Sequence, residues 1–128
     1  MRFVIQHHIT ENEHYDIMFE TEGSDMLLTW QIILSDMDFL LKGAAIKAER
    51  IRDHRKHYLD YEGSVKSSGG SVKIFDSGYC RTLLKENDKF EFELNGKKLA
   101  GNIMLNKIDN NIFEVKYIQI EDITYTSS

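Results

Sequence analysis

Residues 89–101 read KFEFELNGKKLAG and carry the plainest structural signal in the chain. Three apolar residues, Phe90, Phe92 and Leu94, alternate with charged ones, which is the period-two pattern of a strand with one buried face. The Asn95-Gly96 pair that follows favours a two-residue type I′ turn. We therefore expect a β-hairpin whose second strand covers Lys98–Leu105.

Short strands of the same kind are expected along most of the chain. They are Met1–His8, Tyr15–Glu20, Met26–Leu34, Ala45–Arg52, Ser71–Asp76, Tyr79–Leu84, Ile112–Ile118 and Gln119–Tyr125. Ser77-Gly78 and Asn110-Asn111 are interpreted as turns, and Asp36–Gly43 as a short helix. Many short strands at regular spacing predict a mainly β fold, either a barrel or a sandwich.

Length and composition point to a single domain over residues 1–128. A chain of 128 residues can bury a core without disulfides, and its hydrophobic fraction of 41% is ordinary. No apolar run is long enough to span a bilayer, and no secretory signal is evident. Cys80 is the only cysteine, which excludes an intrachain disulfide. We therefore expect a cytoplasmic protein with no membrane partner.

The charge is acidic overall but unevenly distributed. A formal net charge of −5 argues against broad, charge-driven binding of nucleic acid, yet it permits recognition of one phosphate at one site. Basic residues gather around His54: Lys47, Arg50, Arg52, Arg55 and Lys56. This cluster indicates either a solvated basic face or an anion site.

The five histidines fall in two short stretches, and the first of these is a candidate metal site. His14 and Asp16 are two residues apart, so in a strand their side chains leave the same face. His8 precedes His14 by enough residues for a hairpin loop, which would bring it alongside. Two imidazoles and a carboxylate can bind a divalent metal and leave positions open. The alternative is a chance group of surface histidines, and His7 is expected on the opposite face, packed or in solvent.

The second histidine stretch contains His54 and Tyr58, with Arg52 two residues earlier. Near neutral pH, an imidazole can protonate a leaving oxygen or hold a phosphate. Tyr58 can donate a hydrogen bond to a phosphate oxygen. Spacing alone favours an exposed charged edge, and the other interpretation is that His54, Tyr58 and Arg52 act as catalytic residues at a reacting phosphate. The serines and Cys80 have no evident partner base, so no covalent nucleophile is expected.

An ordered series of motifs resembles the 3′-phosphoesterase domain of bacterial DNA ligase D. The matching segments are Phe3–His8, His14–Glu20, Thr29-Trp30, Asp53-His54, Tyr58, Asp60–Gly63, Ile74–Tyr79 and Phe90–Gly101. The resemblance runs from Phe3 to about Ile108, which is most of the chain. It identifies the chain as a stand-alone, divergent member of that family.

The resemblance implies a small closed antiparallel β-barrel with one or two short helices. It implies a divalent metal on His8, His14 and Asp16, with manganese favoured and zinc or another ion as alternatives. It assigns phosphate contacts to His54 and Tyr58. The activity implied is removal of a 3′-terminal ribonucleoside and then of a 3′-phosphate in DNA end repair. The implied partners are DNA or RNA 3′ ends, such as those of a primer–template, together with a separate ligase or polymerase.

The chain also departs from the family's pattern in its cations. Met18 stands where the family has an arginine, Leu34 falls at about the place of a lysine, and Arg52 replaces an acid. Losing a preorganised donor of this kind commonly costs on the order of 10²–10³ in rate. We therefore expect weak or narrow catalysis unless Arg52, Lys47 or Arg55 compensates.

Two alternative functions remain open from the sequence. One is a weak or inactive family member that binds metal or nucleic-acid 3′ ends as an accessory factor. The other is a cupin-like metal oxygenase, suggested by the two-histidine, one-carboxylate set. The ordered motifs argue against the oxygenase, and a dependence on an oxo-acid cosubstrate would revive it.

Overall fold

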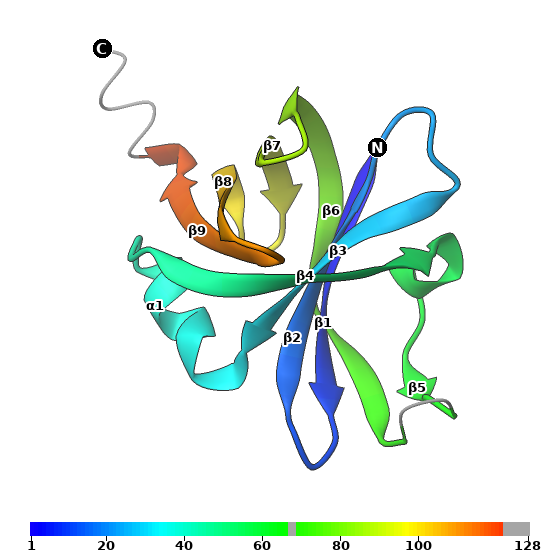
Figure 1. The fold of residues 1–128 in the computed structure, drawn as a ribbon. Helices are drawn as coiled ribbons and strands as arrows, with labels where there is room; N and C mark the ends of the chain where they lie inside the picture. The colour runs from blue at the N-terminus through cyan, green and yellow to red at the C-terminus, as the bar shows by residue number, and fades with distance from the viewer. Residues whose placement is uncertain (67–68, 122–128) are drawn as a thin grey trace.

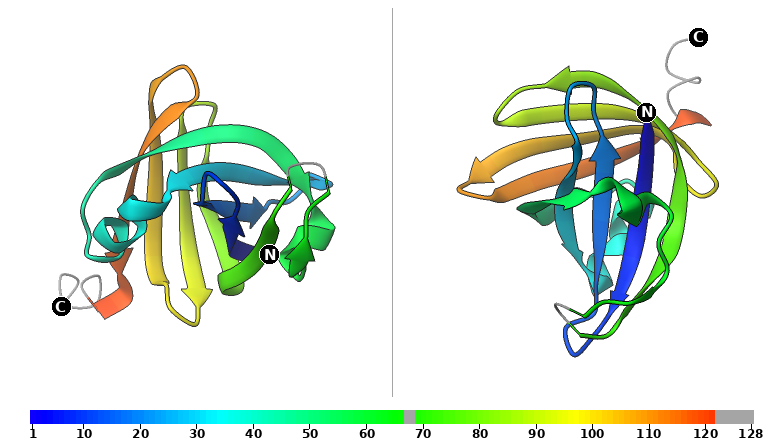
Figure 2. Two further views of the ribbon diagram at one scale, coloured as in Figure 1. Left: turned by 90° about the horizontal axis from the view of Figure 1, so that it is seen from below. Right: turned by 90° about the vertical axis from the view of Figure 1, so that its right-hand side faces the viewer.

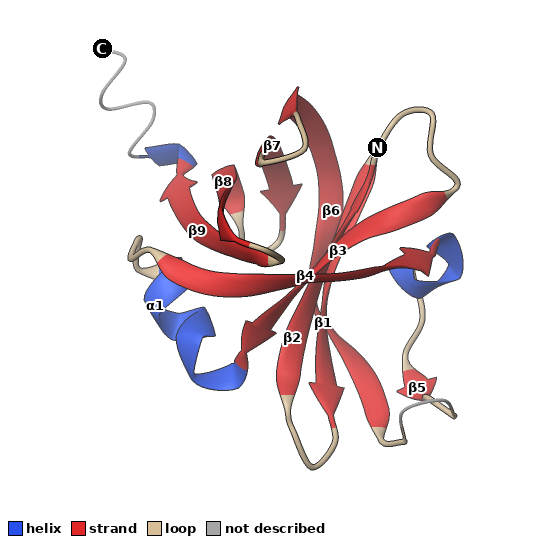
Figure 3. Ribbon diagram, viewed as in Figure 1, coloured by secondary structure: helices blue, strands red, loops and turns tan. Residues whose placement is uncertain are grey.

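The computed structural model describes residues 1–66 and 69–121, which form mainly strands joined by loops and short helices (Figures 1 and 3). The strands are β1 Arg2–Ile9, β2 His14–Glu20, β3 Met26–Ile33, β4 Ile46–Arg55, β5 Gly63–Ser64, β6 Ser71–Lys85, β7 Lys89–Gly96, β8 Ala100–Asp109 and β9 Ile112–Gln119. The short helices are η1 Leu34–Asp36, α1 Met37–Leu41 and η2 Lys56–Leu59.

Antiparallel pairing closes the sheet into a barrel. Strands follow one another in the order β1-β2-β3-β4-β9-β8-β7-β6, and β6 also pairs with β1. The two-residue strand β5 pairs with β6 outside this ring. The predicted closed antiparallel β-barrel with short helices is therefore confirmed.

Closure depends on β6, where the sequence interpretation was wrong. Ser77-Gly78 is no turn, because β6 runs unbroken from Ser71 to Lys85. Its first half pairs with β1 and its second half with β7, and Gly78 lies opposite a residue of each. A Cβ atom at Gly78 would meet the Asn95 carbonyl oxygen at 2.1 Å. This glycine therefore permits close approach of a neighbouring strand.

The β7–β8 turn is shifted from its predicted place. Asn95 and Gly96 are still in strand β7, and the connection falls at Lys97-Lys98. The reason is the carboxylate of Asp76, which accepts hydrogen bonds from the backbone N–H groups of Lys97 and Leu99 at 2.9 and 2.8 Å. A distant residue thus stabilises a turn that the local sequence places two residues earlier.

Replacing Asp76 with alanine is expected to lower the free energy of unfolding by about 2–4 kcal/mol, because buried N–H groups lose their acceptor. Asp76 is only 3% exposed, so water cannot fully substitute for the carboxylate. Urea denaturation measures the change, with exposed Asp88→Ala as the control. Equal midpoints for the two variants would contradict this account of the turn.

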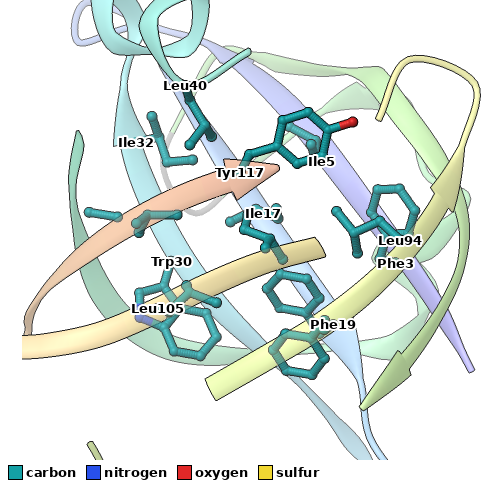
Figure 4. Packing of buried hydrophobic residues seen from close by; sticks show 14 of the residues in the cluster. Phe3, Ile5, Ile17, Phe19, Trp30, Ile32, Leu40, Leu94, Leu105 and Tyr117 are labelled. Carbon is teal, nitrogen blue, oxygen red and sulfur yellow. The ribbon is translucent and has the colours of Figure 1, made fainter. Parts of the chain in front are cut away.

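The barrel interior is filled by the inward faces of the strands in the closed ring (Figure 4). Phe19 stacks on Phe92 with ring centroids 4.0 Å apart, and Trp30 meets Phe90 and Phe113 edge to face. Phe90, Phe92 and Leu94 all point inward, as their alternation predicted. Because the core uses one face of β1, β2 and β3, the opposite face of these strands is left to build a site.

A second apolar cluster covers part of that outer face. Val4, Met18 and Leu27 pack there against Leu59 of η2. Ion pairs from Lys56 to Glu20 and from Arg2 to Asp60 hold the same segment. In the right-hand view of Figure 2, the chain from β4 through η2 to β5 crosses in front of β1 and β2. A hollow is formed beside this crossing segment.

Two further expectations concern the ends of elements. The predicted helix Asp36–Gly43 is shorter than expected, since α1 covers Met37–Leu41 after the turn η1. The predicted strand Gln119–Tyr125 is wrong at residues 120 and 121, because β9 ends at Gln119 and a helical turn follows. Residues 122–125 of that prediction lie outside the described part of the chain. Within residues 1–66 and 69–121, every helix is too short or too polar to cross a bilayer.

Candidate metal and phosphate site

A single hollow on the outer face of β1, β2 and β3 contains all six residues that the sequence singled out. Its volume is about 290 Å³, and the segment from β4 to β5 forms one side of it. The lining residues are Gln6, His8, His14, Asp16, Gln31, Ile51, Arg52, His54, Tyr58, Val65 and Val72. We call this hollow the central pocket.

The β1–β2 hairpin brings the three expected metal ligands together. His8 lies directly opposite His14 in the strand register, and Asp16 follows His14 on the same face. His8 Nδ1 is 3.2 Å from His14 Nε2, which is 3.4 Å from Asp16 Oδ2. Potential ligand atoms of the three residues all lie within 4.8 Å of one another. His7 points the other way and stacks on Tyr15, as predicted.

The hydrogen bonds of this group favour a cation. His14 Nδ1 donates to the carbonyl of Asn12 at 2.8 Å, which leaves the lone pair of Nε2 facing His8 and Asp16 in the neutral ring. Asp16 is 4% exposed, and its Oδ1 has no hydrogen-bond partner in the described structure. A buried carboxylate oxygen is normally satisfied. An unmatched oxygen beside two imidazole nitrogens therefore fits a divalent ion, without selecting which one.

Acid is expected to weaken metal binding at this group. The hydrogen bond to Asp16 raises the pKa of His14 above 6.5, despite the opposing effect of burial. A proton on Nε2 competes with a metal for the same lone pair, so the apparent affinity for Mn²⁺ should fall as pH drops through that raised pKa. In the metal-free protein, acid has the opposite effect on the stability of the fold. The hydrogen-bonded pair of protonated His14 and Asp16 stabilises the folded state below pH 6.5, and this contribution is lost as pH rises through the raised pKa of His14.

Calorimetric titration with Mn²⁺ at about pH 6, 7 and 8 checks this expectation, since those values bracket the usual histidine pKa. Up to about tenfold weaker binding per unit of pH is expected on the acid side, with release of protons on binding. An affinity that does not change over this range would mean that His14 is not a ligand.

A β-bulge positions the second group of residues. Arg52 and Asp53 together stand opposite the single residue Leu28, so the alternation of β4 shifts by one. Ile51 and His54 therefore both line the central pocket although they are three residues apart. The sequence predicted a shared face for Arg52 and His54 from regular spacing, and both do line the pocket, but through this irregularity.

His54 is oriented toward the pocket by its own strand. Its Nδ1 donates to the Arg52 carbonyl at 2.8 Å, which keeps the lone pair of Nε2 available in the neutral ring. The rings of His54 and Tyr58 meet edge to face with centroids 5.5 Å apart. The imidazole, the phenol and the Arg52 side chain thus line the same pocket as the metal group.

Two glutamines complete the pocket and were missed as site residues. Gln6, Asp16 and Gln31 are neighbours in one cross-strand row over β1, β2 and β3. Gln6 is 1% exposed and donates to the carbonyls of Tyr58 and Tyr61, both at 3.0 Å, so it anchors η2 over the pocket. The available signals were the shared face of Gln6 and His8 and a polar Gln31 in a mostly apolar strand.

The positions expected to lack cations are not equivalent. Met18 is fully buried in the second apolar cluster, two residues from Asp16 on the same strand face. Leu34 lies in η1 and does not line the central pocket. The prediction that Leu34 takes the place of a cation in this pocket is therefore wrong. Lys47 lines a different hollow. Of the cations considered as replacements, Arg52 lines the central pocket and Arg55 borders an adjoining one.

Cys80 has no part in this site. Its thiol is buried in the barrel, beside the carbonyl of Arg2 at 3.4 Å. Burial raises the pKa of the Cys80 thiol to about 11. A thiol of this kind carries almost no thiolate at neutral pH and is a poor nucleophile.

In the comparison with known proteins, one family model matches the part of the chain that contains all the lining residues of the central pocket. The family model described as the DNA Ligase D 3′-phosphoesterase domain matches residues 6–107. Similar curated proteins are the multifunctional non-homologous end joining DNA repair protein LigD of Mycobacterium tuberculosis and the corresponding LigD protein of Mycobacterium bovis. Each is 32% identical over 111 residues, which cover 80% of this chain and 14% of the relative. The chain therefore matches a small part of those longer proteins.

Proposed function

The chain belongs to the DNA ligase D 3′-phosphoesterase domain family, and from that premise we propose that it is a metal-dependent phosphoesterase acting on nucleic-acid 3′ ends in DNA end repair. One observation carries the proposal. The group His8, His14 and Asp16 shares the central pocket with His54 and Tyr58. A phosphate placed between the two groups would contact both.

Each side chain has a distinct role in this proposal. A divalent ion held by the two histidines and Asp16 would polarise a phosphoryl oxygen and acidify water. His54, when protonated at Nε2, donates a hydrogen bond to the phosphate or passes that proton to the leaving oxygen. Tyr58 donates a hydrogen bond to a phosphate oxygen, and Arg52 offsets the charge that develops in the transition state.

The proposed substrates are 3′-phosphate and 3′-ribonucleoside ends of DNA or RNA. Manganese is the proposed metal, with zinc or another divalent ion as alternatives that the donor set also accommodates. A ligase or polymerase that uses the resulting 3′-hydroxyl is the proposed partner.

A primer–template with a 5′-labelled, 3′-phosphate-terminated primer tests the function. Incubation with Mn²⁺ should give a 3′-hydroxyl primer that a polymerase can extend, and a chelator should prevent this. A second primer ending in one ribonucleoside tests the nucleoside-removing step. Failure on both substrates with manganese, zinc, cobalt and magnesium would reject the enzymatic proposal.

A second candidate is binding of metal and 3′ ends with little turnover. The buried Met18 favours it, because an apolar side chain occupies the strand face that continues from Asp16. A guanidinium can hold two phosphate oxygens at once, and a thioether cannot. Arg52 is the cation that offsets this loss in the proposed enzyme.

Met18→Arg separates the two candidates. The variant should be less stable by about 2–4 kcal/mol, because it places a charge in an apolar cluster. If a missing cation limits catalysis, the same variant should still raise the rate of 3′-phosphate removal. Leu34→Lys is the matched control and should change neither quantity, since Leu34 lies outside the pocket. Denaturation and single-turnover assays measure both effects, and an unchanged or lower rate in Met18→Arg would contradict the limiting role of that cation.

A further inference from the structure

We propose that a second hollow beside the central pocket binds the next phosphodiester of the nucleic-acid strand, through Arg52 and Arg55. This inference rests on the proposed function, because it assumes that a terminal phosphate occupies the central pocket. It adds a subsite that binds the sugar–phosphate backbone of the strand next to the terminal phosphate.

The two hollows lie next to each other and share part of their wall. The second has a volume of about 360 Å³ and is lined by Met26, Arg52, Asp53, His54, Arg55 and Tyr58. Three of these residues, Arg52, His54 and Tyr58, also line the central pocket. A ligand that contacts His54 from the central pocket therefore lies next to the second hollow, with Arg52 accessible from both.

The charges of the second hollow suit one phosphodiester. Its lining contains two arginines and one carboxylate, that of Asp53, which leaves a positive balance in a chain with a net charge of −5. A phosphodiester carries a single negative charge, and arginine binds phosphate oxygens through paired N–H donors.

Both arginines are available for a ligand. Arg2, Lys56 and Arg81 pair with carboxylates, but neither Arg52 nor Arg55 forms an ion pair in the part of the chain that the structure describes. Both side chains are exposed. Unpaired guanidinium groups beside a shared pocket wall are the arrangement expected of an anion subsite.

The backbone at this hollow is held by contacts that do not involve the arginine side chains. The bulge at Arg52 and Asp53 sets the course of β4, and His54 is tied to the Arg52 carbonyl. Gln6 holds the carbonyl of Tyr58 on the other side. Replacing an arginine side chain should therefore change the charge of the hollow and leave the backbone around it in place.

The test is a double-mutant cycle in which one change removes the charge of an arginine and the other removes the charge of one phosphodiester of the DNA strand. The probes are eight-nucleotide single DNA strands with a 5′ fluorophore and a 3′-phosphate. In one of them the last internucleotide linkage is an uncharged methylphosphonate. Binding is measured by fluorescence anisotropy with EDTA present, so that no turnover occurs. The proteins are wild type, Arg55→Gln and the exposed control Arg81→Gln.

Wild type and Arg81→Gln should each bind the methylphosphonate probe about three- to tenfold more weakly than the charged probe. Arg55→Gln should lose clearly less affinity between the two probes, because only Arg52 remains to contact the linkage, and its salt slope should be smaller by about 0.7, the value for one phosphate contact on a single strand. If all three proteins lose the same factor, the subsite is wrong. The same probe ending in a 3′-hydroxyl reports on the central pocket separately, so equal affinity for phosphate and hydroxyl ends would count against the phosphate contacts proposed for His54 and Tyr58 and leave the cycle interpretable.

Discussion

His14→Ala is expected to remove high-affinity Mn²⁺ binding and to lower the rate of 3′-phosphate removal by at least about 10²-fold. Loss of a group that merely orients a metal ligand costs about 10–100-fold, and loss of a ligand should exceed that. The Nε2 atom of His14 lies between His8 Nδ1 and Asp16 Oδ2, at 3.2 and 3.4 Å, so its removal opens the centre of the group.

His7→Ala is the matched control for this experiment. His7 lies on the same hairpin but bonds Glu13 at 3.0 Å and stacks on Tyr15, away from the central pocket. It should keep the metal affinity and rate of the wild type. Calorimetry and a phosphate-release assay give both quantities, with thermal denaturation to show that each variant is folded. Full Mn²⁺ affinity in a folded His14→Ala protein would show that the metal group has been misidentified.

His54→Gln should lower kcat for 3′-phosphate removal by about 10²–10³ while the affinity for Mn²⁺ stays within about twofold of wild type. General acid catalysis commonly contributes 10²–10⁴, and loss of a phosphate donor acts in the same direction. Glutamine keeps the polarity of the side chain but cannot exchange a proton. The limb of the pH–rate profile that depends on the protonated imidazole should therefore disappear.

His57→Gln controls for the general effect of losing a histidine from this segment. His57 lies in η2 and contacts the rings of Tyr58 and Tyr61, but it does not line the central pocket. Its kcat and pH profile should remain those of the wild type. A His54→Gln enzyme that keeps its rate and its pH dependence would exclude a role for His54 in proton transfer and phosphate binding.

Much of the candidate site is readable in the sequence because its residues obey strand alternation. His14 and Asp16 share a face for that reason, and a five-residue connection is enough to bring His8 opposite His14. Period two also places Phe90, Phe92 and Leu94 in the barrel interior. These features depend only on contacts between neighbouring residues or across a short hairpin.

Glycine predicted turns poorly, because this residue occurs both in turns and at positions where another segment of the chain packs closely against the backbone. Gly78 and Gly96 were both expected in turns, and both lie in strands. A Cβ atom at Gly96 would meet Asp76 Oδ2 at 2.5 Å and Phe3 Cζ at 2.7 Å. Both neighbours are distant in sequence, so no local pattern distinguishes this use of glycine from a type I′ turn.

The sequence by itself determined the strand faces, the inward aromatic residues and the composition of the two histidine groups, since side-chain alternation is a local property of an extended chain. Only the tertiary structure decided that the two groups meet. That meeting requires the bulge at Arg52 and Asp53, the cover of η2 held by Gln6, and the pairing of β6 with both β1 and β7. Each of these arises from hydrogen bonds or packing between residues far apart in the chain, where the spacing of residue types carries no information.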